Sequence, residues 1–184
     1  MRSDSHLRLV ELTCTALFAA LMALCSWISL PFPVPFTLQT FALFASLLTL
    51  GGRLGVYSTA VYLLLGTVGL PVFSGFRSGP GTLFDITGGY LWGMLAAALL
   101  YWAITSLSGN TRRVRMVACV LGLLLCYALG TAWLMLFYAK TSPLRLSAAL
   151  AAYVLPYVFP DLLKLSAAAF LSQRMNPLKK RIFI

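Results

Sequence analysis

An acidic and a basic residue stand about one helical turn apart in a strongly apolar segment near the C-terminal end. Asp161 and Lys164 lie within the run 146–171, and Pro160 directly precedes the aspartate. A carboxylate or ammonium group in hydrocarbon costs roughly 2.5–3.5 kcal/mol on insertion scales, so such groups face a cavity or one another. The aspartate can accept N–H donors, and the lysine can donate to a carbonyl or a carboxylate. We therefore expect a polar ligand site here; the alternative is an ion pair that only neutralises both charges.

The spacing of this segment predicts a bent helix with one polar face. In a helix Tyr157, Asp161 and Lys164 project from the same side, since they are four and three residues apart. Pro156 and Pro160 donate no backbone hydrogen bond, which frees carbonyl groups and bends the helix. Freed backbone groups are tolerated at membrane depth only beside protein or a water-lined cavity. The bend and the polar face therefore favour the ligand site.

Further candidate residues follow a proline-rich strip. The strip, 31–37, alternates prolines with other residues, which presets a stiff extended backbone. It either lies across a cavity mouth or is a rigid connector. Gln39 and Thr40 come next and place an amide and a hydroxyl near the outer surface. These two groups serve a ligand or bond to neighbouring helices.

A second unusual stretch, 70–81, is rich in glycine and carries two phenylalanines. Loops of about 12 residues or more in compact domains are mostly functional or disordered, so we expect this one to act as a lid. After it, Asp85 or Thr87 can cap the free amides of a helix. Gly88 and Gly89 let a ligand, or equally a neighbouring helix, touch the backbone.

The elements that must position these residues are membrane helices. Of 184 residues, 60% are hydrophobic and 10% charged, and the mean hydropathy is +0.90. Six apolar stretches approach the ~20 residues of a spanning helix, namely 12–30, 36–50, 54–70, 86–107, 116–139 and one after Arg145. We predict an all-α integral membrane protein, a bundle of six transmembrane helices forming a single domain over 1–184. The four cysteines lie in apolar helices without metal-ligand spacing, so no metal site is expected.

The net charge of +10 is distributed as in a membrane protein and not as in a nucleic-acid-binding one. Ten of the Lys and Arg residues fall at the chain ends and in every second loop, against three in the other loops. Loop Lys/Arg bias sets orientation, so both termini are expected to be cytoplasmic in a multi-pass protein of the plasma membrane. Contact with anionic membrane lipid is a secondary interpretation, and no nucleic acid is expected as a partner.

Small residues form a stripe along the first helix. Ala16, Ala19, Ala20 and Ala23 follow the helical period. Small faces let another backbone approach closely in lipid. The stripe is either a groove for a partner or a packing face within the bundle.

Four motifs, in this order, resemble those of the BioY family, the biotin-binding S components of energy-coupling-factor (ECF) vitamin transporters: PFTLQT at 35–40, GTVGLPVF at 66–73, TGGYLWG at 87–93 and PDLLK at 160–164. The resemblance spans nearly the whole chain. One departure is Asp85-Ile86, where that family more often has Gly-Pro.

The resemblance implies the ECF S-component fold and a subunit that captures biotin with high affinity on the outer side. Delivery would need a transmembrane coupling subunit and a pair of cytoplasmic ATPases, so the chain itself is expected to be neither an enzyme nor bound to a cofactor. The implied substrate-binding residues are Phe36, Gln39, Thr40, Phe73, Thr87, Gly88, Gly89, Tyr90, Tyr157, Asp161 and Lys164. The implied partner-docking residues are Ala16, Ala19, Ala20 and Ala23, which favours the partner-groove interpretation.

Two rival functions stay open at this point. An S component for another vitamin, such as thiamine or riboflavin, would share the fold and the partners but not the pocket. An intramembrane enzyme would use Asp85 and Asp161 as a proton-sharing dyad. The adjacent lysine keeps Asp161 ionised, which argues against the enzyme.

Overall fold

The protein is almost entirely helical. The computed structural model describes residues 4–30, 34–139 and 145–183. The helices and strands are α1 (Asp4–Trp27), β1 (Ser29–Leu30), β2 (Phe36–Thr37), α2 (Gln39–Leu50), α3 (Gly52–Val68), the 3₁₀ turn η1 (Ser74–Phe76), α4 (Pro80–Phe84), α5 (Gly88–Leu107), α6 (Arg112–Tyr138), α7 (Leu146–Tyr153) and α8 (Leu155–Phe183). Pro31 and Pro33 of the proline-rich strip lie outside the described residues.

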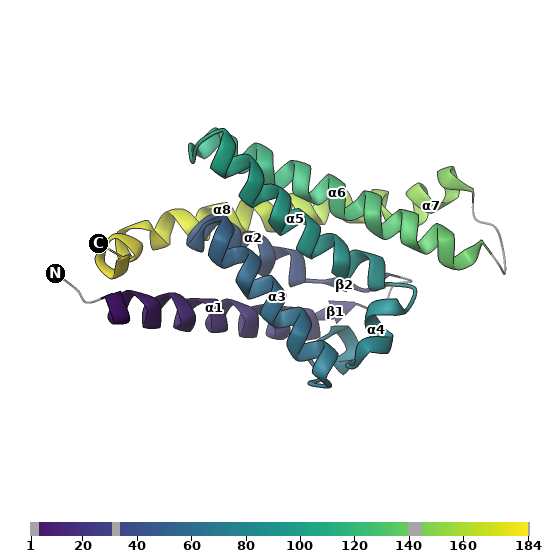
Figure 1. The fold of residues 1–184 in the computed structure, drawn as a ribbon. Helices are drawn as coiled ribbons and strands as arrows, with labels where there is room; N and C mark the ends of the chain where they lie inside the picture. Colours follow the sequence, from purple (N-terminus) through teal and green to yellow (C-terminus); the bar gives the residue numbers. More distant parts are fainter. Residues whose placement is uncertain (1–3, 31–33, 140–144, 184) are drawn as a thin grey trace.

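The long helices lie roughly lengthwise beside one another, which gives the molecule two distinct ends (Figure 1). The start of α1, the α2–α3 turn, the α5–α6 turn and the end of α8 lie at one end, here called the terminal end. The hairpin of β1 and β2, together with α4 and α7, lies at the other, here called the loop end. The motif-bearing loops are thus gathered at the end opposite the chain termini.

Within the described residues, three helices are long and apolar enough to cross a membrane, and there is a fourth if the bent pair α7 and α8 counts as one span. The three are 5–27 of α1, α5 and α6. The other two apolar stretches form α2 and α3, with only 12 and 17 residues. Length and composition therefore support a helical membrane protein with three to four spans, and both the count of six and the cytoplasmic termini stay predictions.

The predicted bend near Pro156 is confirmed. The axes of α7 and α8 differ by 42°, and the break falls at Val154. Pro156 has no N–H to donate to the Ala152 carbonyl, so one hydrogen bond across the break is missing.

The sequence analysis did not predict the small antiparallel hairpin. Ser29 pairs with Thr37 and Leu30 with Phe36. The Leu38 N–H also donates to the Cys25 carbonyl at 3.1 Å, which ties the returning chain to the end of α1. The hairpin thereby fixes the residues just before Gln39 and Thr40 over the loop end.

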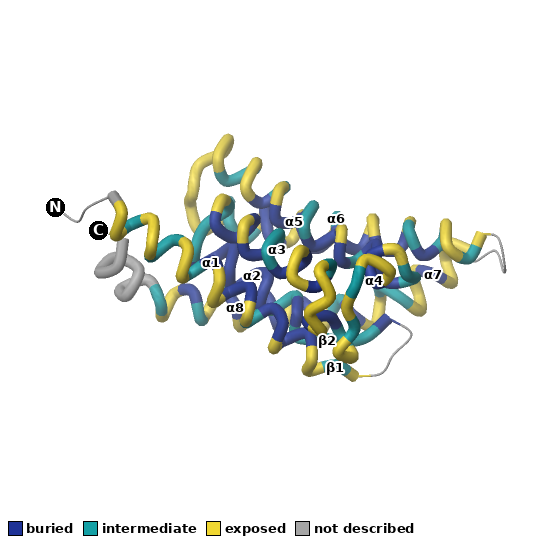
Figure 2. Tube along the Cα trace, turned by 60° about the horizontal axis from the view of Figure 1, so that its bottom comes forward, coloured by how far each residue is buried: buried dark blue, intermediate teal, exposed yellow. Residues whose placement is uncertain are grey.

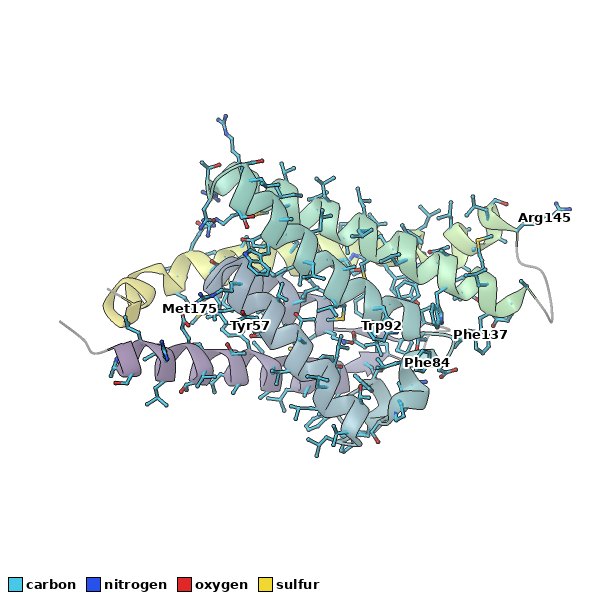
Figure 3. The ribbon with its side chains drawn as sticks, in the orientation of Figure 1. Tyr57, Phe84, Trp92, Phe137, Arg145 and Met175 are labelled. Carbon is cyan, nitrogen blue, oxygen red and sulfur yellow. The ribbon has the colours of Figure 1, made fainter. Side chains whose placement is uncertain are left out.

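Buried residues run through the centre of the bundle, and its outer faces are exposed (Figure 2). The outer faces carry large apolar side chains, among them Tyr57, Trp92 and Phe137 (Figure 3). An apolar exterior over the helix faces is what a lipid environment requires.

Candidate functional site

A cavity at the loop end brings together most of the polar and aromatic residues singled out from the sequence. Its volume is about 100 Å³, well above the ~10–15 Å³ that one water needs on this measure. Its walls come from the 34–40 segment, the 70–87 loop region, α5, α6, α7 and α8. The lining residues are Val34, Pro35, Thr37, Gln39, Thr40, Phe73, Ser74, Arg77, Thr82, Thr87, Tyr90, Leu91, Met94, Leu123, Cys126, Tyr127, Tyr153, Tyr157, Asp161 and Lys164.

Asp161 and Lys164 form a buried ion pair in the wall of this cavity. Lys164 Nζ lies 2.8 Å from Asp161 Oδ1, and the two side chains are 8% and 5% exposed. Thr40 Oγ1 donates to Oδ1 at 2.8 Å, and Tyr127 Oη donates to Oδ2 at 2.5 Å. The carboxylate thus accepts hydrogen bonds from three different elements, namely α2, α6 and its own helix α8.

The lysine is equally well bonded. Nζ donates to the Thr37 carbonyl at 2.6 Å and approaches Thr40 Oγ1 at 3.3 Å. It also lies 4.0 Å from the centre of the Phe36 ring, a cation–π contact. The two charges therefore neutralise each other and form part of a cavity wall, and contact of this wall with a ligand stays a prediction.

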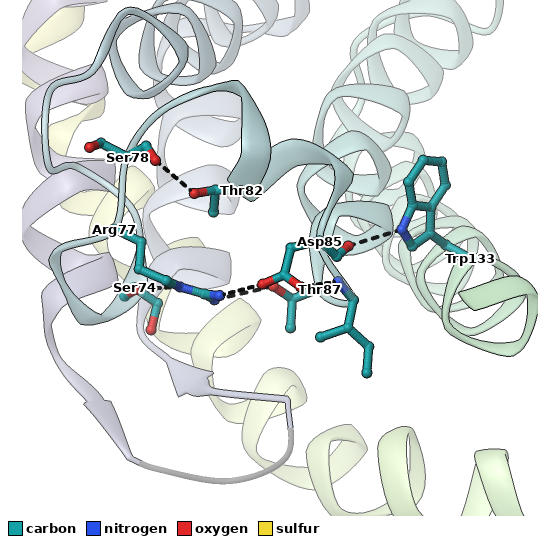
Figure 4. A network of polar contacts seen from close by, with 8 residues as sticks. Ser74, Arg77, Ser78, Thr82, Asp85, Thr87 and Trp133 are labelled. Carbon is teal, nitrogen blue, oxygen red and sulfur yellow. Dashed lines mark hydrogen bonds and ion pairs between the residues drawn. The ribbon is translucent and has the colours of Figure 1, made fainter. Parts of the chain in front are cut away.

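A second polar cluster includes Arg77 and Thr87 of the cavity lining, and its contacts are drawn in Figure 4. Arg77 Nη1 lies 2.8 Å from Asp85 Oδ2, and Nη2 donates to Thr87 Oγ1 at 3.2 Å. Trp133 Nε1 donates to the Asp85 carbonyl at 3.0 Å. Neither Asp85 nor Thr87 caps α5: no described side chain accepts from the free amides at its start, and Asp85 Oδ1 accepts only from the N–H of Ile86 before the helix. The capping prediction was therefore wrong, and both side chains instead hold Arg77 beside the cavity.

The aspartate dyad is contradicted by this geometry. Asp85 pairs with Arg77 and Asp161 with Lys164. A proton-sharing dyad needs two carboxylates that repel each other in one site, whereas each of these has its own cation.

The two glycines of the TGGY motif serve packing. A Cβ on Gly88 would lie 2.0 Å from the Leu83 carbonyl oxygen, and one on Gly89 would lie 2.3 Å from Cβ of Trp133. Both positions are filled by the protein's own atoms, and the described residues lining the cavity include neither glycine. Of the two alternatives for Gly88 and Gly89, close packing is the one that the structure shows.

The remaining tyrosine and amide groups of the site bond to other parts of the protein. Tyr157 Oη donates to the Val34 carbonyl, and Tyr90 Oη to the Tyr153 carbonyl at 3.4 Å. Gln39 Nε2 donates to Tyr62 Oη at 3.0 Å, so its amide already bonds to a neighbouring helix. Phe36 contacts Lys164 but is not among the described residues that line the cavity.

Of the cavity-lining residues that the sequence analysis did not single out, Tyr127 and Arg77 are the two that bond to an acidic residue. Tyr127 gives no signal, because a single tyrosine in a long apolar helix is equally compatible with a packing role. Arg77 was noted only as a charge in an outer loop. Its loop position and its distance of eight residues from Asp85 could have suggested the pair.

The alanine stripe on α1 is divided between two faces. Ala19 and Ala23 are 1% and 8% exposed and belong to the core of the bundle. Ala16 and Ala20 are exposed. Only the second pair is accessible to a partner, which narrows the predicted docking face to Ala16 and Ala20.

Chemically, the cavity can hold a small molecule with a mixed surface. Asp161 offers acceptor oxygens, Lys164 and Arg77 offer donors, and Phe73, Leu91 and Met94 offer apolar surface. A pocket with mostly apolar walls and a few placed polar groups is typical of ligand sites.

Comparison with known proteins gives matches along almost the whole chain. The family model described as the BioY family matches residues 1–181. A protein named biotin transporter BioY from Thermotoga maritima is 36% identical over 170 residues, which cover 92% of this chain and 97% of that protein. A protein named probable biotin transporter BioY from Pyrococcus horikoshii is 34% identical over 168 residues, covering 90% of this chain and 96% of that one.

A solved structure shows the same fold. It is described as the S-component for biotin from an ECF-type ABC transporter, and it matches with a TM-score of 0.80 at 20% sequence identity. The match covers 96% of this chain and 95% of that chain.

Proposed function

The chain belongs to the BioY family, and we propose that it is the biotin-binding S component of an ECF-type ABC transporter. The observation that carries the proposal is the buried Asp161–Lys164 pair in the wall of the cavity at the loop end. The chain is a substrate-capturing subunit and not an enzyme.

The chemistry of biotin suits the residues of the cavity. The ureido N–H groups of biotin need an acceptor such as Asp161, and its carbonyl or carboxylate needs a donor such as Lys164. Phe73, Tyr90 and Met94 would cover the apolar bicycle and chain. Most of the affinity would come from enclosure, with the polar groups setting the orientation.

We further propose six membrane crossings, with α2 and α3 as short crossings and α7 with α8 as one bent crossing. Both termini would then lie in the cytoplasm and the cavity would open outside the cell membrane. The excess of Lys and Arg at the terminal end supports this orientation.

The proposed partners are a transmembrane coupling subunit and a pair of cytoplasmic ATPases. The sequence contains no GxxxxGK[ST] phosphate-binding loop, so ATP hydrolysis would be supplied by those subunits. The exposed side of α1 at Ala16 and Ala20 is the proposed contact with the coupling subunit.

Titration of the purified protein with biotin tests the function. We expect saturable binding of biotin in a calorimeter and none of thiamine or riboflavin at the same concentrations. Binding of either control in place of biotin would assign the cavity to another vitamin.

Replacing Ala20 with tryptophan is expected to abolish uptake while sparing biotin binding. A bulky side chain on an exposed small face blocks close approach of a partner helix but disturbs nothing inside the bundle. The measurement is biotin uptake in cells, together with calorimetry on the purified variant.

Two further variants serve as controls for Ala20→Trp. Leu124 on α6 is 57% exposed, so Leu124→Trp should retain both uptake and binding. Ala23 is buried, so Ala23→Trp should lose both through overpacking. If Ala20→Trp lost binding as well as uptake, its face would belong to the bundle interior.

A further inference from the structure

A basic groove lies far from the biotin cavity, at the terminal end, between the start of α6 and the second half of α8. Arg112, Arg115, Ser172 and Gln173 line it, together with the apolar Leu48, Met116 and Ala169. Its volume is about 20 Å³, which is room for an oxygen-sized group and not for a larger molecule. A ligand here would insert one atom and leave the rest outside.

The arginines of this groove have no carboxylate to balance them among the described residues. The chain has only four acidic residues. Glu11 pairs with Arg53, Asp85 with Arg77 and Asp161 with Lys164. The fourth is Asp4, at the start of α1. The start of α6 instead carries three arginines. This N-terminal end of the helix already bears the positive partial charge of the helix dipole.

Arg115 has bonding capacity left over. Nη1 donates to the Leu48 carbonyl at 3.3 Å, a long bond, and that same carbonyl already accepts from Ser172 Oγ at 2.8 Å. Within the described part of the chain, Nε of Arg115 is buried and has no acceptor. Because Nε itself is buried, an acceptor from outside the chain would meet this guanidinium at its terminal nitrogens, whose one bond among the described residues is the long one to Leu48.

The surroundings of the groove indicate what brings that acceptor. Beyond the arginines, α6 and α8 present exposed apolar side chains, including Val117 at 55% and Phe170 at 61%. A molecule with an anionic head and apolar tails would match both the charge and the flanking surface. Basic pockets between membrane helices bind lipid headgroups in this way.

We propose that this groove binds the phosphate of an anionic phospholipid, with one phosphate oxygen directed at Arg115 and a second at Arg112. Guanidinium groups are favoured partners of phosphate oxygens, and the exposed Arg112 would meet the second oxygen outside the groove. The acyl chains would lie along the exposed apolar faces of α6 and α8. This proposal is independent of the ligand in the cavity at the loop end.

Native mass spectrometry of the purified full chain tests it, with phosphatidylglycerol and phosphatidylcholine of equal chain length as competing probes. We expect phosphatidylglycerol to be retained preferentially. Arg115→Gln and Arg112→Gln should each lower its relative affinity by about tenfold or more, as expected for a lost charge-assisted hydrogen bond. Arg115 also donates to the Leu48 carbonyl of α2, so Arg115→Gln could loosen that contact. Arg112→Gln tests the site without this effect.

Arg113→Gln is the matched control, because Arg113 is exposed, stands between the other two and does not line the groove. A surface charge that attracts anionic lipid only diffusely changes lipid affinity about fivefold or less. Arg113→Gln should therefore lose clearly less affinity for phosphatidylglycerol than the other two variants. Equal losses in all three variants would overturn a specific site in favour of diffuse attraction. Glycerol phosphate binding as tightly as phosphatidylglycerol would overturn the lipid assignment. Biotin binding should be unchanged throughout.

Discussion

Replacing Lys164 with alanine is expected to weaken biotin binding roughly 10- to 150-fold, because a charge-assisted hydrogen bond contributes about 1.5–3 kcal/mol. The variant should still fold. The partner Asp161 keeps two donors, Thr40 Oγ1 at 2.8 Å and Tyr127 Oη at 2.5 Å, so it is not left without partners. Calorimetry with biotin and a size-exclusion profile of the same sample measure both effects.

Lys164→Met is the control that separates charge from volume. Methionine keeps most of the stem that packs near Phe36 but removes the donors. The Lys164→Met variant should lose as much biotin affinity as Lys164→Ala if the lysine donors contact biotin. Unchanged affinity in both variants would mean that the pair only neutralises its own charges, and the proposed binding mode would then be wrong.

The centre of the candidate site could be predicted because its geometry is local. A helix places residues three and four apart on one face, so Tyr157, Asp161 and Lys164 had to project together once the segment was helical. Their burial was expected because charged side chains in an apolar membrane segment face a cavity or one another. The partners of the pair could not be predicted in the same way, because Tyr127 and Thr40 reach Asp161 only through helix packing.

The predicted helix caps at the start of α5, in contrast, failed because the partners of these side chains are set by the fold and not by the local sequence. Asp85 and Thr87 have the residue types of a helix cap, and local preference favours that use. Arg77 of the preceding loop instead pairs with Asp85 Oδ2 at 2.8 Å and donates to Thr87 Oγ1, while Asp85 Oδ1 accepts from the N–H of Ile86, which lies before α5. Only the folded loop brings Arg77 to that position.

Helix boundaries were predicted best where proline or glycine sets them. The break before Pro156 follows from the missing N–H, and the α2–α3 turn falls at Gly51, whose φ of 92° favours glycine. The hairpin of β1 and β2 could not be foreseen, since two-residue strands leave no periodic pattern.

The second large effect concerns a glycine outside the cavity. A Cβ on Gly66 would lie 2.1 Å from Cζ and 2.4 Å from Cε2 of Phe73. The Phe73 ring is 1% exposed, packs edge-on against Tyr62 and lines the cavity. Gly66→Ala must therefore displace the ring, although alanine is the better helix former.

The backbone next to Phe73 cannot easily move away from Gly66. The preceding carbonyl, that of Val72, accepts from Ser26 Oγ at 2.5 Å and from Tyr62 Oη at 3.1 Å. The ring must then shift within the cavity, or the loop must leave α1. Either change takes away apolar cavity wall that would contact biotin. Overpacking costs about 1–3 kcal/mol, so we expect biotin affinity to fall about 5- to 150-fold by calorimetry.

Two comparisons make the Gly66→Ala result specific to Phe73. Among the residues that the structure describes, Gly81 has no heavy atom within 4 Å of an added Cβ, so Gly81→Ala should bind biotin as the unaltered protein does. In a Phe73→Ala background the clash no longer exists, and Gly66→Ala should add little further loss, which is the non-additivity of residues in direct contact. If Gly66→Ala caused the same loss with and without the Phe73 ring, the effect would come from α3 itself. The ring would then not be the group through which Gly66 controls the cavity.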